Sequence, residues 1–380
     1  MSQKRSIFEE VSETTGKQTQ IAQPGVISRP RGARKGIRAW LILLFVMVFA
    51  MILIGGLTRL TDSGLSITEW KPVTGAMPPI GVEAWQNEFA KYQQIPEYRL
   101  QNAGMSLAEF KAIYWWEWGH RQLGRTIGLI WALGFFGFLV ARKIPVGWTP
   151  RLLGIGALGG LQGAIGWWMV SSGLSGEMLD VASYRLAIHL GLAFIILGFI
   201  AWYVLALSRP EADLMQARRA RDGKLFTKVS GLMHMAMLQI LLGALVAGID
   251  AGRSYPDWPL MNGGIFPPDP FSITPLWRNF FEDAGLVQFM HRVMGYLLFA
   301  YGLFAWSRGH ASANRATSHA FDLMGLLLIA QVVLGIITVM QGAPLWLGLL
   351  HQFGAVALWV AILRARFLAQ YPLSQTIKGT

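Results

Sequence analysis

The chain has 380 residues, of which 53% are hydrophobic and only 14% are charged. Soluble domains carry about 25% charged residues, so this composition excludes an ordinary soluble domain and a disordered chain. The absence of Cys excludes disulfides, iron–sulfur clusters and thiolate metal sites. The net charge of +12 would suggest nucleic acid for a soluble protein, but the basic residues cluster in a few loops, which indicates membrane topology and no nucleic-acid partner.

Residues 1–36 are polar and end in a basic cluster just before the first apolar stretch. A cleaved secretory signal would place its apolar region much nearer the start. A mitochondrial targeting sequence fits less well, because the segment contains three Glu residues. We predict that residues 1–36 form a disordered cytoplasmic tail.

Eight apolar stretches follow, each long enough to cross a ~30 Å hydrocarbon core as a helix. They cover approximately residues 38–57, 120–141, 150–171, 185–207, 229–249, 289–306, 320–340 and 346–364. Backbone groups in lipid must form hydrogen bonds within their own segment, and these lengths do not suit barrel strands. The sequence therefore predicts an all-α integral membrane protein with eight transmembrane helices.

Charge alternates between the connecting loops. Basic residues are concentrated in the segments 142–151, 209–228, 308–315 and 364–378, whereas they are sparser along 58–119, 172–184 and 250–288. The positive-inside rule places both termini in the cytoplasm and the second set of loops outside. We expect a multi-pass protein of the bacterial cell (inner) membrane, and the mitochondrial inner membrane is the less favoured alternative.

The chain also repeats itself. Residues 55–79, GGLTRLTDSGLSITEWKPVTGAMPP, align without a gap with residues 243–267, GALVAGIDAGRSYPDWPLMNGGIFP. Further on, HRQLG at 120–124 aligns with HRVMG at 291–295, and Gln162 aligns with Gln331. We predict two tandem four-helix bundles, residues 37–210 and 211–368, related by a pseudo-two-fold axis along the membrane normal, with a cytoplasmic tail at 369–380.

Four of the seven His residues follow this repeat. His120, His189, His291 and His351 lie on the four even-numbered helices, each about one turn from the predicted outer end. Two His facing each other across a four-helix bundle can supply both axial ligands of a haem. A lone interhelical hydrogen-bonding role is the alternative, which we disfavour for four His at one depth. Zinc fits less well, because two His per bundle leave too few ligands.

The two halves differ one turn before the first His of each pair. Glu117 precedes His120, whereas Gln288 stands at the matching position of the second half. A carboxylate there could hold a proton or a positive charge, which predicts chemistry in the first bundle and cofactor binding in the second. The alternative is an exposed acid at a helix start. Arg121 and Arg292 follow the two His and suit haem propionates, with interfacial snorkelling as the alternative.

Taken together, these motifs resemble the haem A synthase family. GGLTRLTDSGLSITEWKPVTGAMPP, EWGHR, YRLAIHL, QFMHR and LLHQ occur in the family's order, and the likeness runs from about residue 38 to 366. Many members carry a Cys pair in the first outer loop, so this chain resembles the branch without it.

The resemblance implies an enzyme that converts haem O to haem A for cytochrome oxidase, through two hydroxylations of the C8 methyl group and loss of water. By position, it implies that His291 and His351 are axial ligands of a resident haem B. It implies that His120 and His189 face the substrate haem, and that Glu117 is the carboxylate needed for turnover. The expected partners are the farnesyltransferase that forms haem O, cytochrome oxidase assembly factors and an electron acceptor that the motifs do not identify. A homo-oligomer is compatible with the sequence.

Two other functions share parts of this pattern. A bis-His membrane dihaem electron carrier would usually place its haems near both membrane faces, and here all four His are predicted on one side. A haem transporter or chaperone without catalytic activity needs no carboxylate beside only one site. The Glu117/Gln288 difference therefore favours the enzyme.

Overall fold

The computed structural model describes residues 33–176 and 178–375. The predicted tail over residues 1–36 lies outside the described residues except for its end, where the first helix already begins at Arg34. The second predicted tail, 369–380, begins within the last helix, which continues to Gln370, and its final residues 376–380 lie outside the described part.

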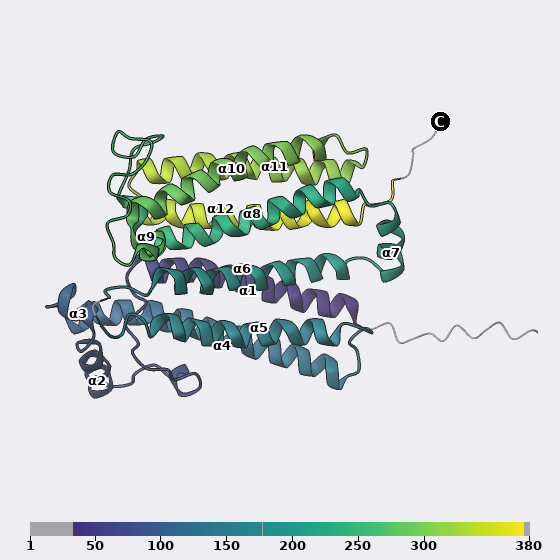
Figure 1. The fold of residues 1–380 in the computed structure, drawn as a ribbon. Coiled ribbons are helices and arrows are strands. Elements are labelled where there is room, and N and C mark those ends of the chain that lie inside the picture. Colours follow the sequence, from purple (N-terminus) through teal and green to yellow (C-terminus); the bar gives the residue numbers. More distant parts are fainter. Residues whose placement is uncertain (1–32, 177, 376–380) are drawn as a thin grey trace, which may run out of the picture. The chain divides into compact units, whose positions relative to one another are not determined.

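Eight long helices account for most of the described chain (Figure 1). They are α1 (Arg34–Leu60), α4 (Leu107–Val140), α5 (Thr149–Val170), α6 (Ser183–Leu207), α8 (Gly223–Gly248), α10 (Ala284–His310), α11 (Arg315–Met340) and α12 (Leu345–Gln370). The shorter α-helices are α2 (Val82–Tyr92), α3 (Pro96–Leu100), α7 (Glu211–Arg219) and α9 (Asn279–Glu282), and the 3₁₀ turns are η1 (Thr74–Ala76), η2 (Ala251–Arg253) and η3 (Leu276–Arg278). The described residues contain no β-strand, so the all-α prediction is confirmed for them.

Seven of the long helices are long and apolar enough to cross a membrane, which makes the chain a multi-pass membrane protein. The exception is α10, which spans 27 residues but carries Gln288, His291 and Arg292 in its first turns. An eighth span therefore stays a prediction.

The helix that carries His120 begins much earlier than its apolar stretch indicates. It starts at Leu107, where Ser106 and Glu109 form a reciprocal capping box. The predicted start at residue 120 is wrong, because the helix continues past the apolar stretch into a layer of aromatic side chains. Glu117 consequently lies in mid-helix and is only 2% exposed. The alternative of an exposed acid at a helix start is also wrong.

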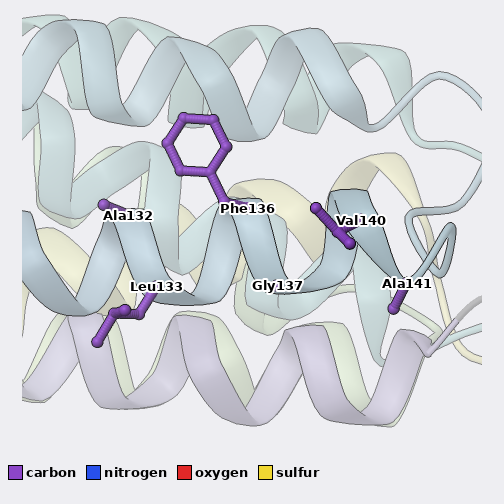
Figure 2. A pocket seen from close by; sticks show the side chains of 6 residues that line it. All are labelled: Ala132, Leu133, Phe136, Gly137, Val140 and Ala141. Atoms are coloured by element: carbon purple, nitrogen blue, oxygen red, sulfur yellow. The ribbon is translucent and has the colours of Figure 1, made fainter.

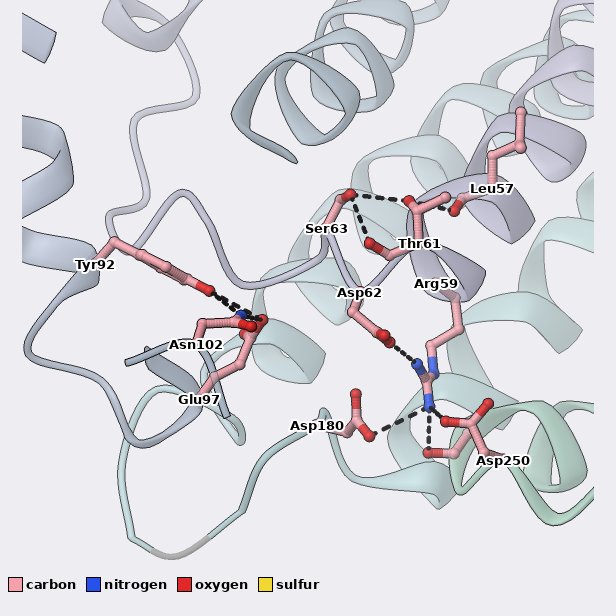
Figure 3. Close-up of polar contacts among 11 residues, drawn as sticks. Leu57, Arg59, Thr61, Asp62, Ser63, Tyr92, Glu97, Asn102, Asp180 and Asp250 are labelled. Atoms are coloured by element: carbon pink, nitrogen blue, oxygen red, sulfur yellow. Dashed lines mark hydrogen bonds and ion pairs between the residues drawn. The ribbon is translucent and has the colours of Figure 1, made fainter. Parts of the chain in front are cut away.

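That aromatic layer is formed by α2, α3 and the first turns of α4, which lie together at one end of the bundle (Figure 1). Trp85 and Tyr92 pack against Phe110 and Tyr114 of α4 with ring centroids 5.0 to 5.2 Å apart. Within the layer, buried Glu97 accepts hydrogen bonds from the Tyr92 hydroxyl and the Asn102 amide (Figure 3). Burial raises the pKa of Glu97 to about 8, and this effect exceeds the lowering by the Tyr92 hydrogen bond.

The helices contact one another in a repeating order. In the first half, α1 packs on α4 and α6, and α5 packs on α6; in the second half, α8 packs on α10 and α12, and α11 packs on α12. The halves meet chiefly where α6 lies against α8 and where α12 lies against α6 and α1. The buried core runs continuously across this junction, for example where Phe194 packs against Trp359.

A buried guanidinium joins the two halves at the end of α1 (Figure 3). The Arg59 side chain is 9% exposed and pairs with Asp62 at 2.8 Å, Asp180 at 3.3 Å and Asp250 at 3.0 Å. Asp62 and Asp250 are equivalent in the sequence repeat, and both have a left-handed backbone, with φ of 47° and 51°. Three carboxylates thus surround this one guanidinium.

Candidate functional site

The four repeat histidines lie at one level of the bundle. Each is followed by 18 to 20 further residues before its helix ends, at Val140, Leu207, His310 or Gln370. The distance from the start of the helix to its His is not the same in the four helices. The helix α4 begins more than three turns before its His, whereas α6, α10 and α12 begin about two turns before theirs. The prediction of one turn from the outer end is therefore wrong, most clearly for His120.

The histidines come together in two pairs, one in each half. The first half contains His120 on α4 and His189 on α6, and the second half contains His291 on α10 and His351 on α12. That the two members of each pair ligate one haem stays a prediction.

Each ring rests against a glycine of a neighbouring helix. A Cβ added to Gly166, Gly243 or Gly335 would lie 2.8 to 3.0 Å from Cε1 of His189, His291 or His351, so only glycine fits there without displacement. At Gly55, which faces His120, the same atom would lie 3.6 Å from the ring, an ordinary contact distance.

One turn before three of these glycines stands a glutamine that the sequence analysis did not assign to the site. Gln162, Gln239 and Gln331 donate from Nε2 to the backbone carbonyls of His189, His291 and His351 at 3.0, 3.1 and 2.8 Å. Each amide nitrogen also lies 3.1 to 3.4 Å from a ring nitrogen of the same His. The sequence signal for all three is a Gln placed four residues before a Gly on the helix that packs against the His helix.

Glu117 is held by four donors. One carboxylate oxygen accepts from Arg121 Nε at 3.0 Å and Nη2 at 2.5 Å, and the other accepts from the Ser66 hydroxyl and the Ile67 backbone N–H, both at 2.7 Å. Arg121 also donates to the backbone carbonyls of Ile67 and Glu69. This network fastens the loop after α1 to α4, one turn from His120.

The second half has a similar but smaller set of hydrogen bonds between the helix and the loop. Gln288 and Arg292 both donate to the carbonyl of Tyr255, at 3.2 and 2.7 Å, and Tyr255 aligns with Ile67 in the repeat. Arg292 also donates to the Leu260 carbonyl. The Oε1 atom of Gln288 is buried without a hydrogen-bond partner among the described residues.

Comparison with known proteins identifies the family. The model of a family described as "Cytochrome oxidase assembly protein" matches residues 38–363. A protein named "Heme A synthase" from Ruegeria sp. (strain TM1040) is 64% identical, with 99% of each chain covered. Proteins of the same name from Dinoroseobacter shibae and Paracoccus denitrificans are 63% and 59% identical, with at least 99% of each chain covered. The chain belongs to the haem A synthase family.

In this haem A synthase family member, the buried polar atoms around three of the four repeat histidines are compatible with an iron porphyrin held by each His pair. Among the described residues, buried side-chain atoms without a partner include Oε1 of Gln162, Gln239 and Gln331 and Nδ1 of His189. A histidine that binds a metal through one ring nitrogen needs an acceptor for the N–H of the other. In each of these three glutamines it is Nε2 that lies near the ring, and the buried Oε1 has no partner among the described residues.

The arginines expected at haem propionates have other partners. Arg121 and Arg292 bond to loop carbonyls, as described above, and Arg185 donates to the Trp168 carbonyl at 2.7 Å and stacks on the Trp168 ring. In Arg185 and Arg292 the buried Nε atom lacks a partner within the described residues, so both retain a donor for a bound carboxylate.

An apolar pocket on α4 lies away from these groups (Figure 2). Its lining runs from Ala132 to Ala141 on one face of a single helix, so it is a surface groove with no polar group to orient a ligand. Within residues 33–176 and 178–375, no three His, Asp or Glu side chains converge as a metal site without a porphyrin would require.

Proposed function

We propose that this protein converts haem O to haem A by oxidising the C8 methyl group to a formyl group, through two hydroxylations and loss of water. The observation that carries the proposal is full-length identity of 58–64% to proteins named as heme A synthases, together with two His pairs at one level. The same relatives count against an electron carrier or a haem transporter, since each is named for a synthase.

The two His pairs have different tasks in this proposal. His120 and His189 hold the substrate haem O, and His291 and His351 hold a resident haem B. The assignment is supported by the groups one turn away: Glu117 offers an ionisable carboxylate beside the first pair, whereas Gln288 offers only an amide beside the second. A bound haem B would supply electron transfer.

The residues of the first half would orient the substrate and manage protons. Because Glu117 sits one turn before His120 on the same helix, its carboxylate lies beside any macrocycle bound to that ring. Arg121, Ser66 and the Ile67 N–H fix the carboxylate in place, so it can exchange a proton or stabilise positive charge without reorganising. The loop that these groups hold would also keep bulk water from the site.

The architecture completes the proposal: eight spans in two four-helix bundles, residues 37–210 and 211–368, related by a pseudo-two-fold axis. The equivalent helix contacts in the two halves and the matching left-handed Asp62 and Asp250 support it. The basic segments 142–151 and 209–228 would lie in the cytoplasm with both termini, in a bacterial inner membrane. A farnesyltransferase that makes haem O and cytochrome oxidase assembly factors are the proposed partners.

The direct test is to express the full chain in a cell that makes haem O but no haem A, and to separate the extracted haems by chromatography. We expect haem A to appear, and to be lost with His120→Ala while the protein is still inserted in the membrane. A well-expressed wild-type chain that left haem O unchanged would overturn the proposal.

A further inference from the structure

The four His sites share one construction, and one of them departs from it. Three rings are contacted by the amide of a glutamine placed four residues before a glycine, whereas the helix facing His120 carries Met51 four residues before Gly55. Among the hydrogen bonds of the described residues, none reaches the ring or the carbonyl of His120 from a side chain.

Met51 occupies the place that a glutamine fills in the second half. Its terminal Cε lies 3.5 Å from a Cβ built on Gly124, the residue four positions after His120. In the second half, the Gln239 amide nitrogen lies 3.3 Å from a Cβ built on Gly295, four positions after His291. The two side chains therefore point to the same spot of equivalent helix pairs and differ in chemistry.

That chemistry matters for how firmly a His holds a metal. An amide can donate to the His carbonyl and accept from the ring N–H, which fixes the ring's rotation and tautomer; a thioether donates nothing and accepts only weakly. Loss of such a supporting partner typically lowers metal affinity by about 10–100-fold. A Cβ built on Gly55 would also lie 3.6 Å from the His120 ring, farther than the 2.8 to 3.0 Å for the corresponding atom at the other three rings.

We propose that residue 51 is a positioning residue that makes the haem of the first half exchangeable. Both ligands of the second-half haem are held by amides, from Gln239 and Gln331, and that haem stays. In the first half only His189 is held, and Met51 leaves His120 free to release its iron, as a site that must take in haem O and give up haem A requires. This inference rests on the proposed function, which assigns a haem to each His pair.

The test measures haem release from the purified full-length protein in detergent. The protein is loaded with haem O, mixed with excess apomyoglobin as haem acceptor, and followed by absorbance. We expect a fast phase from the first half and a slow phase from the second. Met51→Gln should slow the fast phase about 10–100-fold, and Gln239→Met should speed the slow phase by a similar factor.

Two controls separate this role from others. Met47→Gln adds the same amide one turn farther from His120 and should leave both phases unchanged. Met51→Leu keeps the apolar volume without sulfur and should also leave the fast phase unchanged; faster release there would mean that the sulfur itself holds the haem, which would overturn the inference.

The result can fail independently of the proposed function. If His291→Ala removes the slow phase but neither Met51→Gln nor Gln239→Met changes a rate, the haem assignment stands and the role of residue 51 is wrong. If His291→Ala leaves both phases intact, the proposed haem sites themselves are wrong.

Discussion

The two halves bring a His pair to the same level, but they surround it with different polar groups. The first half has Glu117 one turn before His120 and Met51 one turn before the glycine that faces His120; the second half has Gln288 and Gln239 at these positions. The helix order, the ring-contacting glycines and the Arg after the first His are common to both. The two halves therefore share the elements that position the histidines and differ in the polar groups around them.

The halves also differ in what covers the His level. The first half adds α2, α3 and the long start of α4, packed as an aromatic layer, whereas the segment after α8 contains only 3₁₀ turns and the four-residue α9. In the first half the loop is fixed through an ion pair, and in the second through an amide and a guanidinium on one carbonyl. The larger covering layer therefore belongs to the half that contains His120 and His189, the pair proposed to hold the substrate haem.

The largest expected effect comes from removing a candidate haem ligand from one half only. His291→Ala or His351→Ala should abolish the b-type haem of the purified protein, because a bis-His site loses half its ligands. His120→Ala should retain that haem and lose haem A formation. The pyridine haemochrome spectrum measures the first, and chromatography of extracted haems the second. His234→Ala is the control and should change neither, because the His234 ring lies against the Ser230 carbonyl of its own helix.

The second prediction exchanges the carboxylate for the group that the second half uses. Glu117→Gln should lower haem A formation by roughly 10²–10⁴-fold, the usual contribution of a positioned acid or base, while the b-type haem remains. The substituted amide would also direct N–H groups at the donors of Arg121 or Ile67, so the loop should exchange amide hydrogens faster. Both effects are measured on the same preparation.

Glu109→Gln is the matched change on the same helix, at an exposed capping position. It should leave haem A formation within a few-fold of wild type, since it removes only part of an exposed helix cap. Normal turnover by Glu117→Gln would show that the carboxylate only holds the loop in place and takes no part in the reaction.

The smallest expected effect concerns the aromatic layer that only the first half has. Burial raises the pKa of Glu97 to about 8, so the folded layer keeps a proton that the unfolded chain loses above about 4.5. The stability of the layer should therefore fall as the pH rises from about 4.5 and level off above about 8. Amide hydrogen-exchange protection of α2 and α3, corrected for intrinsic rates, measures this.

Glu97→Gln should remove most of that pH dependence and raise protection at alkaline pH, because its amide stays neutral. Glu83→Gln, an exposed change on α2, should leave the dependence as in wild type. Equal pH profiles for Glu97→Gln and wild type would show that Glu97 ionises without cost in the folded layer.

Much of the helix arrangement could be predicted from apolar length alone. The eight stretches correspond to the eight long helices, because a segment in lipid must satisfy its own backbone and has no choice but helix. The prediction failed at α4. Residues Leu107 to Gly119 include polar and aromatic side chains that interrupt the apolar pattern, so more than three further helical turns were not predicted. There the helix is stabilised by contacts with α2 and α3, which no local pattern contains.

For the site, the sequence by itself determined which His residues pair, since the repeat and the helix period place them at one level on equivalent helices. Only the tertiary structure decided what each charged group does. Arg121 and Arg292 were both compatible with propionates, but long guanidinium side chains bind the nearest acceptors that folding supplies. For these two arginines the acceptors include the loop carbonyls of Ile67 and Tyr255. The difference between Met51 and Gln239 is visible in the sequence. Only the tertiary structure shows that each side chain packs against the helix that carries the first His of its half, because helix packing and not local sequence decides which side chains meet.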